Sequence, residues 1–314
     1  MKKRICLLLI CLALLVTLPG CGSSNTAVSE RKSIVATLFP HYDFARAIVG
    51  DKMDVIMVLP SGIEGHSFEP TPQDIINIAN ADIFVYTGDF MEPWAAEILS
   101  GTDNKNLNIV ELSASLGAGI IANEHEDEAI HEFLDEHGHG FDPHIWLDMT
   151  IAVGMVEDIL DAVIALDPEN EAFYTANAED YIAQLEELDQ QFIDISFGCE
   201  RPIMAFGGRF AYAYFVRRYF LDYEAAYRSC SADAEASVQN VANLIEFIKD
   251  NDIPYIFHEE LTEPKLAVSV AEQTGAELLQ FNVAHNVSKD DFDRGVTFID
   301  LMKQNVENLE VGLN

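Results

Sequence analysis

Basic residues are scarce in this chain. Its 314 residues include 18 lysines and arginines against 53 aspartates and glutamates, which gives a formal net charge of −35. A protein that binds DNA or RNA needs a basic surface, so this shortage argues against nucleic acid as a partner. Hydrophobic residues make up 49% of the chain, which is too many for a disordered acidic protein and enough for one large or two medium domains. The acidity also suits the attraction of cations.

Long hydrophobic runs are equally rare, and the longest one stands near the N-terminus. Three basic residues precede an apolar stretch from residue 5 to 18, which is too short to span a membrane comfortably. This pattern is typical of an export signal, which we assign to residues 1–20. The sequence LPGC at residues 18–21 resembles a bacterial lipobox, so we expect Cys21 to carry a lipid.

Residues 21–32 are then a polar, lipidated tether. No later stretch is long and apolar enough to cross a bilayer, which places the protein at the outer face of the cell membrane, held by its N-terminus. A plain secretory signal or an N-terminal membrane anchor is the alternative.

Cysteine is scarce as well. Three of the five cysteines lie within the first 21 residues, which leaves Cys199 and Cys230. An exported protein can form a disulfide, but Cys199 precedes a predicted strand and Cys230 follows the next one. In neighbouring parallel strands these positions are at opposite ends of the sheet, so the sequence favours two inert thiols over a disulfide.

Short β-rich runs alternate with helical patterns along the rest of the chain. The predicted strands are residues 33–39, 54–59, 81–87, 108–112, 202–206, 223–227, 254–258 and 277–282. Such alternation indicates parallel sheets, so the fold class is α/β, with two α/β lobes. We assign residues 33–167 to an N-terminal lobe, which includes a loop at 122–141, and residues 198–314 to a C-terminal lobe.

One long helix is predicted between the lobes, at residues 168–197. Apolar residues recur there at spacings of three, four and seven, without glycine or proline from Glu169 to Ile195. Its length of roughly 40 Å matches a whole small domain. A coiled-coil helix is the alternative, which the lack of a heptad mate weakens. A second long helix is predicted from Asp290 to about Leu313, at the end of the chain.

Nine histidines carry most of the functional information. Four of them fall between Glu124 and Gly140, among many carboxylates and without apolar periodicity. Imidazoles and carboxylates in such a stretch are typical of a flexible metal-collecting loop. A solvated charge run is the alternative interpretation.

Three other histidines, His66, His144 and His285, stand in turns next to predicted strands or helices. In parallel α/β sheets, ligands bind beyond the carboxyl ends of the strands, and both lobes place imidazoles at this edge. Glu259, with Glu260 beside it, leaves another strand in the same way and completes a four-coordinate set. We therefore predict a metal site made of His66, His144, His285 and Glu259.

The stretches around these residues resemble the substrate-binding proteins of bacterial ABC importers for zinc and manganese. The matching motifs are GHSFEPTPQD (65–74), DPHIWLD (142–148), FAYAYF (210–215) and GVTFIDLMKQNVENL (295–309). The resemblance covers the chain from about Ser33 on. It implies two α/β lobes joined by one rigid helix, with a divalent cation held between them.

The resemblance also implies roles for single residues. It makes His66 and His144 the first two metal ligands and places His285 near the fourth. The third ligand of the family, a histidine or glutamate, stands three residues before an aromatic that corresponds to Tyr212, and Arg209 occupies that position here. Arginine stays protonated and has no lone pair to offer a cation.

The Arg209 substitution leaves four interpretations open. The site is three-coordinate with water, or the carboxylate of Glu259 or Glu260 swings in to bind the metal. Alternatively, Arg209 pairs with a ligand carboxylate, or the site is inactive.

The donor set favours zinc as the metal. Neutral imidazoles in a tetrahedral array suit zinc, whereas manganese sites prefer oxygen ligands and more of them. Manganese or iron is the alternative. We therefore predict a monomer that binds zinc with high affinity outside the cytoplasm and delivers it to the permease of an ABC importer.

An exported metallohydrolase is the rival class of protein. Such an enzyme needs an open coordination position and a general base. The chain has His-Glu pairs, but none has a second histidine at the metalloprotease spacing, and no Gly-x-Ser-x-Gly sequence occurs. A metal-stabilised adhesin is a second rival, for which the sequence has no signature. We expect no enzymatic activity.

Overall fold

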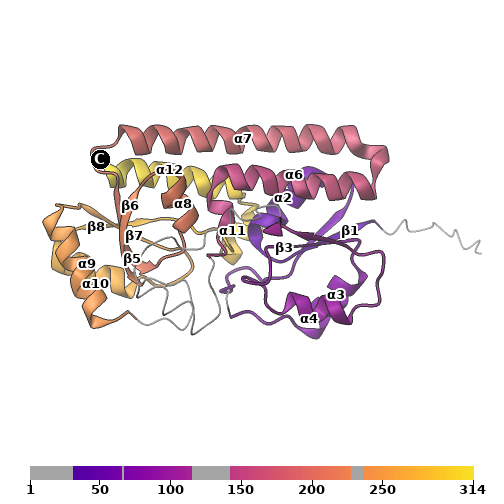
Figure 1. Ribbon diagram of the computed structural model, residues 1–314, viewed down its shortest axis with the longest axis horizontal. Helices are drawn as coiled ribbons and strands as arrows, with labels where there is room; N and C mark the ends of the chain where they lie inside the picture. The colour runs from indigo at the N-terminus through magenta and orange to yellow at the C-terminus, as the bar shows by residue number, and fades with distance from the viewer. Residues whose placement is uncertain (1–30, 66, 115–141, 228–235) are drawn as a thin grey trace, which may run out of the picture. The chain divides into compact units, whose positions relative to one another are not determined.

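The first lobe is built around a sheet of four parallel strands in the order β2-β1-β3-β4. The computed structural model describes residues 31–65, 67–114, 142–227 and 236–314. The elements of this lobe are β1 (Ser33–Ala36), α2 (Phe39–Val49), β2 (Asp54–Met57), α3 (Pro72–Asn80), β3 (Ile83–Tyr86), α4 (Ala95–Gly101) and β4 (Asn108–Glu111) (Figure 1). The central strand β3 is buried along its whole length, as a parallel strand between two neighbours should be.

The second lobe repeats this plan with the strand order β6-β5-β7-β8, again all parallel. Its elements are β5 (Ile203–Arg209), α8 (Ala213–Arg218), β6 (Asp222–Tyr227), α9 (Val238–Asp250), β7 (Tyr255–His258), α10 (Lys265–Thr274), β8 (Glu277–Gln280), α11 (Lys289–Arg294) and α12 (Phe298–Leu313). The predicted fold class, two α/β lobes with parallel sheets, is therefore confirmed.

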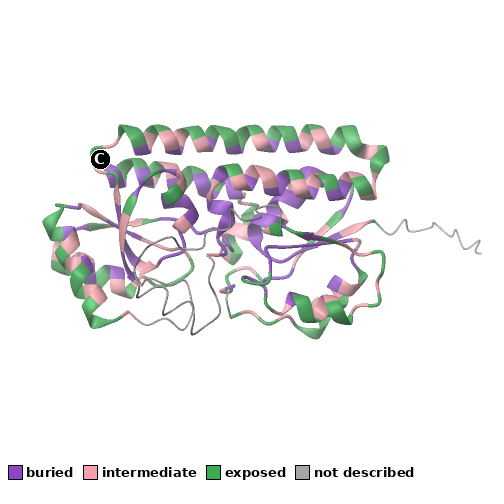
Figure 2. Ribbon diagram, in the orientation of Figure 1, coloured by how far each residue is buried: buried purple, intermediate pink, exposed green. Residues whose placement is uncertain are grey.

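The long helix between the lobes is α7 (Glu171–Gly198), 28 residues that rise over about 42 Å. It follows α6 (Met149–Leu166) and the short 3-10 helix η3 (Pro168–Asn170). Helix α7 packs against α2 and α6 and also against α12 (Figure 1). Its buried face is visible as a recurring stripe in Figure 2 and consists of Tyr174, Ala178, Tyr181, Leu185, Leu188, Phe192 and Ser196.

The start of α3 shows how the sequence sets a helix end. Thr71 is the N-cap, and its hydroxyl accepts a hydrogen bond from Asp74 N, while the Asp74 carboxylate accepts one from Thr71 N at 2.9 Å. Pro72 occupies the first helical position, where its missing N–H costs nothing. The residues Thr-Pro-Gln-Asp at 71–74 are typical of a helix start, and α3 begins there.

The end of the chain differs from the prediction. The single helix expected from Asp290 to Leu313 is wrong, because the chain forms two helices, α11 and α12, with a turn between them. Gly295 ends α11 with φ of 75°, a left-handed conformation that glycine adopts readily. Thr297 then caps α12 through a second capping box, with Asp300.

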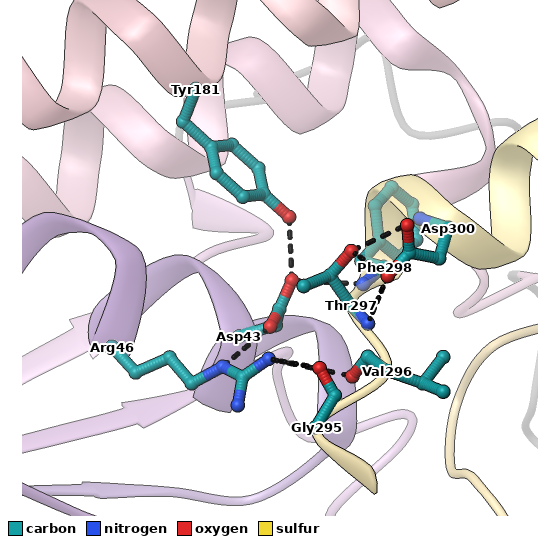
Figure 3. A network of polar contacts seen from close by, with 8 residues as sticks. All are labelled: Asp43, Arg46, Tyr181, Gly295, Val296, Thr297, Phe298 and Asp300. Carbon is teal, nitrogen blue, oxygen red and sulfur yellow. Dashed lines mark hydrogen bonds and ion pairs between the residues drawn. The ribbon is translucent and has the colours of Figure 1, made fainter. Parts of the chain in front are cut away.

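Both lobes and the linking helix meet at a buried aspartate, Asp43 of α2 (Figure 3). Its Oδ2 accepts hydrogen bonds from Tyr181 Oη of α7 at 2.7 Å and from Phe298 N of α12 at 2.9 Å. Its Oδ1 accepts one from Arg46 Nε at 2.7 Å, and Arg46 also donates to two carbonyl oxygens in the turn before α12. Burial raises the pKa of Asp43, although Arg46 and the hydrogen bonds oppose this. The carboxylate thus fastens α2, α7 and α12 together.

The largest hydrophobic cluster also crosses from one lobe to the other. It contains side chains of β1 and β3, the apolar residues of the α7 stripe, and side chains of β5, α8 and α12. Phe44 of α2, for example, packs edge-on against both Tyr181 and Phe298, with ring centroids 5.6 and 5.2 Å away. Two smaller clusters lie between β5 and α9–α10 and around α3 and α4. The two lobes therefore share one core.

Several predicted features lie outside the described residues: the signal at 1–20, Cys21, His66, the loop at 122–141 and Cys230. Cys199 is half-buried, and its thiol donates to Ser196 O at 3.2 Å; it forms no disulfide with any described residue. Within the described ranges, none of the helices combines the length and the hydrophobicity that a membrane span requires.

Candidate metal site

His144 stands between the two lobes, just before the 3-10 helix η2 (Ile145–Leu147), and is 1% exposed. Its Nδ1 lies 2.6 Å from Asp142 Oδ1, and Asp142 Oδ2 accepts a hydrogen bond from Ala213 N of the second lobe. Burial raises the pKa of Asp142, but the nearby imidazole and the hydrogen bonds outweigh this and leave that pKa below its ordinary value. A carboxylate that accepts from Nδ1–H fixes the tautomer with a lone pair on Nε2, the form that binds metal.

Trp146 joins this histidine to the second lobe. Its ring is fully buried and packs edge-on against His144, with ring centroids 5.3 Å apart. Its Nε1–H donates to Val283 O at 2.7 Å, two residues before His285. One side chain therefore contacts the first candidate ligand and holds the loop that carries the second.

We expect Trp146→Phe to lower the free energy of unfolding by about 1–3 kcal/mol, because it leaves the buried Val283 carbonyl without its donor. The measurement is urea unfolding followed by far-UV circular dichroism. Trp94, the other tryptophan, is only half-buried, so Trp94→Phe is the matched control and should cost less. Equal losses in both variants would contradict the role assigned to the Val283 hydrogen bond.

His285 lies in the loop after β8 and is 8% exposed. Its carbonyl oxygen accepts a hydrogen bond from Phe39 N of the first lobe at 3.1 Å. The next residue, Asn286, donates from Nδ2 to Pro60 O and Ile63 O, both at 2.8 Å. The loop that carries His285 is thus held by backbone atoms of the first lobe.

Gly65 explains how closely the loop of the first lobe approaches His285. A Cβ on Gly65 would lie 3.4 Å from His285 Cδ2 and 3.0 Å from Met91 Cε. An added Cβ would press on the Met91 methyl group and just touch the imidazole, so glycine leaves room between them. His66 follows directly in the sequence but lies outside the described residues.

The two adjacent glutamates after β7 differ in their environment. Both carboxylate oxygens of Glu260 accept hydrogen bonds from the His285 loop, from Val283 N and Ala284 N, both at 2.7 Å. Burial raises the pKa of Glu260 to about 7, against these hydrogen bonds. Glu259 accepts from Thr262 Oγ1 at 2.9 Å, and burial raises its pKa as well. Glu260 therefore supports the loop.

Arg209 is the last residue of strand β5 and lies near His144 and His285. The pairing of β5 with β6 shifts in register between Phe206 and Arg209. Within the shift, Gly207 lies so close to α10 that an added Cβ would come within 2.4 Å of Ala267 Cβ. Close backbone packing thus sets the path of the strand end that carries Arg209.

A cavity of about 60 Å³ brings these residues together. It is lined by Gly62, Glu64, His144, Arg209, Ala211, Glu259, Glu260, Leu261, Thr262, Val283 and His285. Of the four predicted ligands, His144, His285 and Glu259 line it and come from both lobes. Within the part of the chain that the structure describes, no three His, Cys, Asp or Glu side chains are arranged so as to hold a metal ion.

A buried polar cluster contacts Trp146 through the ring of His41. No functional group is predicted there from the sequence. Thr37 and Thr87 follow β1 and β3, and both hydroxyls donate to Glu92 Oε1, at 2.5 and 3.1 Å. His41 Nδ1 lies 3.1 Å from Thr37 Oγ1, and its ring packs edge-on against Trp146. Burial lowers the pKa of His41 to about 3 and raises that of Glu92 to about 7. Two threonines directly after strands are the signal in the sequence that marks this cluster.

The cluster predicts a specific pH dependence of stability. The pKa of Glu92 is higher in the folded chain than in the unfolded chain, about 7 against 4.5. Its contribution to the free energy of unfolding is therefore present at low pH and is lost as the pH rises through 7. Between about pH 5 and pH 8, we expect the wild type to lose about 2.5 kcal/mol of unfolding free energy relative to Glu92→Gln. Urea unfolding of both metal-free proteins at several pH values measures this difference, in which the contribution of His41 cancels. Parallel pH profiles would refute the shift.

Comparison with known proteins identifies the family. The model of the zinc-uptake complex component A, periplasmic, matches residues 34–312. The chain belongs to this family. The family resemblance predicted from the motifs is confirmed, and so is the function class, a non-enzymatic substrate-binding component for zinc uptake by an ABC transporter. The rival prediction of a metallohydrolase is not supported.

Members with curated names agree with this assignment. The high-affinity zinc uptake system protein ZnuA of Bacillus subtilis is 33% identical over 302 residues, which cover 94% of this chain and 93% of that protein. The zinc-binding lipoprotein AdcA of Streptococcus pneumoniae is 30% identical over 313 residues, which cover 98% of this chain but 60% of AdcA. The chain thus spans less than two thirds of AdcA.

A solved structure accounts for that difference in length. The crystal structure of the Zn(II)-bound ZnuA-like domain of Streptococcus pneumoniae AdcA is similar to this chain, with a TM-score of 0.74 and 27% identity. The match covers 90% of this chain and 99% of that domain. This member of the family therefore has the same fold.

Proposed function

We propose that this chain captures zinc outside the cytoplasm and delivers it to the permease of an ABC importer. The observation that carries the proposal is the cavity between the lobes, which both His144 and His285 line. Each comes from a different lobe, and hydrogen bonds from the opposite lobe hold the segment around each one. The zinc-uptake and zinc-binding names of the relatives support zinc as the cargo.

The proposed ligands are His144, His285 and His66, with Glu259 as a carboxylate at the edge of the cavity. Support for His66 comes from the preceding residue Gly65, at which an added Cβ would lie 3.4 Å from His285 Cδ2. Neutral imidazoles suit zinc better than manganese, which prefers oxygen ligands. The Asp142 carboxylate keeps His144 in the tautomer that binds metal.

The proposal includes attachment to the membrane. The LPGC sequence at 18–21 provides a lipid site at Cys21, and the relative AdcA is named a lipoprotein. A lipid at Cys21 would hold the chain at the outer face of the membrane as a monomer, next to the permease. The acidic surface and the His-rich segment at 124–140 would raise the local concentration of cations.

The test is a metal titration of the chain from residue 22 on, beside a deletion of residues 124–140 and a His66→Ala variant. We expect one tightly bound zinc, which survives the deletion and is lost in His66→Ala. A parallel titration with manganese should show weaker binding. If tight binding disappears with the deletion and does not respond to His66→Ala, the cavity is not the transport site.

A further inference from the structure

The loop that carries His285 contains a strained residue. Ala284, directly before His285, has φ of 62°, a left-handed conformation that glycine adopts readily and alanine seldom adopts. The Ala284 side chain is fully buried, at 0% exposed. Such a backbone conformation costs free energy and persists only where neighbouring groups hold it. The position of the His285 imidazole therefore depends on the groups that hold Ala284.

Glu260 is one of these groups. Its Oε2 accepts a hydrogen bond from Val283 N and its Oε1 accepts one from Ala284 N, both at 2.7 Å. Successive backbone N–H groups next to a left-handed residue form a small concavity that binds anions. Hydrogen bonds to a charged acceptor are also stronger than hydrogen bonds to a neutral one. The Glu260 carboxylate thus stabilises the backbone conformation from which the His285 side chain starts.

The peptide group between Val283 and Ala284 is held at both ends. Its oxygen, Val283 O, accepts from Trp146 Nε1 of the first lobe at 2.7 Å. Its N–H, on Ala284, donates to Glu260 of the second lobe. Relaxation of the φ angle of Ala284 requires this peptide plane to rotate, and rotation breaks both hydrogen bonds. Without the carboxylate, the donor on Trp146 alone opposes that rotation.

The two neighbouring glutamates of the cavity differ in what their oxygens contact. Glu259 accepts from the Thr262 hydroxyl at 2.9 Å, through Oε1. Both oxygens of Glu260 accept from backbone N–H groups, so a direct bond to zinc would compete for the same oxygens. The contacts of Glu260 therefore favour an action on the loop over an action on the metal.

We propose that Glu260 is a positioning residue for zinc binding, which holds the His285 imidazole in place by fixing the peptide group between Val283 and Ala284. The inference rests on the proposed function, in which His285 is a zinc ligand. It gives the adjacent glutamates different tasks. Glu259 supplies an oxygen at the edge of the cavity, whereas Glu260 acts through His285.

The test is a double-mutant cycle on zinc affinity, measured with chelators of graded affinity. It uses the chain from residue 22 on, the variants Glu260→Gln and His285→Ala, and the variant with both changes. Glutamine keeps the size of the side chain but turns an NH2 group toward a backbone N–H. We expect Glu260→Gln to weaken zinc binding by about 10-fold to 100-fold. In the His285→Ala background the same change should cost less than about threefold, because no imidazole remains to be positioned.

Hydrogen exchange tests the same contact in the unaltered, metal-free chain. The amide hydrogens of Val283 and Ala284 should exchange at least about 100-fold more slowly than in an unstructured peptide. Glu263→Gln is the matched control for the affinity measurements. It removes a carboxylate from the same connection between β7 and α10, but the Glu263 side chain is 77% exposed. This variant should keep the zinc affinity and the slow exchange of the unaltered chain.

Equal losses from Glu260→Gln with and without His285 would mean that Glu260 acts on zinc directly, and would overturn the inference. Unchanged affinity in Glu260→Gln, or fast exchange at Val283 and Ala284, would also overturn it. In each of these cases the unaltered chain still binds zinc, so the proposed function stands. Absence of tight zinc binding by the unaltered chain would instead refute the proposed function. Because hydrogen exchange needs no substitution, a variant that fails to fold still leaves a decisive measurement.

Discussion

Replacing Asp43 by alanine is expected to lower the free energy of unfolding by about 3–5 kcal/mol. Three donors lose their acceptor at once: Tyr181 Oη, Phe298 N and Arg46 Nε. The Asp43 side chain is 1% exposed, so water does not easily replace the carboxylate, and each orphaned buried group costs about 1–3 kcal/mol. Urea unfolding at neutral pH measures the loss.

The control lies at the same helix start. Asp300 belongs to the capping box of α12 but is exposed, so Asp300→Ala should cost only about 1 kcal/mol. If Asp43→Ala destabilises the chain no more than Asp300→Ala, the junction in Figure 3 is an ordinary helix cap and does not join the lobes.

Replacing His144 by alanine is expected to weaken zinc binding by about 100-fold or more, because the proposed site with three imidazoles would lose one of its ligands. Competition with a chromophoric chelator measures this change. The loss should appear with little effect on the circular dichroism spectrum, since the neighbouring Trp146 keeps its hydrogen bond to Val283 O.

Two further substitutions serve as comparisons for His144→Ala. Asp142→Asn keeps His144 but removes the carboxylate at 2.6 Å from its Nδ1, so we expect a smaller loss of about 10-fold to 100-fold. His258 does not line the cavity, and its Nδ1 lies 2.9 Å from Glu259 O, a contact that asparagine can replace. His258→Asn should therefore leave zinc affinity unchanged. Equal zinc affinity in His144→Ala and the wild type would show that His144 is not a zinc ligand.

Local signals in the sequence are sufficient to predict most of the fold. Alternating runs predict both parallel sheets, and Thr71 with Pro72 and Asp74 predicts the start of α3. The same kind of signal, Thr297 followed by Asp300, marks the start of α12. The prediction of one longer helix is wrong there because apolar periodicity continues across the break, whereas the capping box and the glycine at 295 determine where the helices end and begin.

The sequence predicts individual residues of the site from their positions in turns. It does not predict the contacts that hold them in place. The positions of His285 and Glu259 after strands, and of His144 before a short helix, are local features, and the structure brings these residues to one cavity. The contacts that hold them are not local, because Trp146 with Val283 and Asn286 with Pro60 are pairs far apart in the chain. Such pairs have no local pattern, and only tertiary packing creates them.

The shared core has a consequence for the order in which the chain folds. Helix α12, which ends one residue before the C-terminus, packs against α7 and against α2 of the first lobe, and its Phe298 contacts Phe44. Because a chain is synthesised from its N-terminus, the first lobe cannot complete its hydrophobic interior until the last 16-residue helix has emerged. Until then, the apolar side chains of the first lobe that α12 covers stay exposed to solvent.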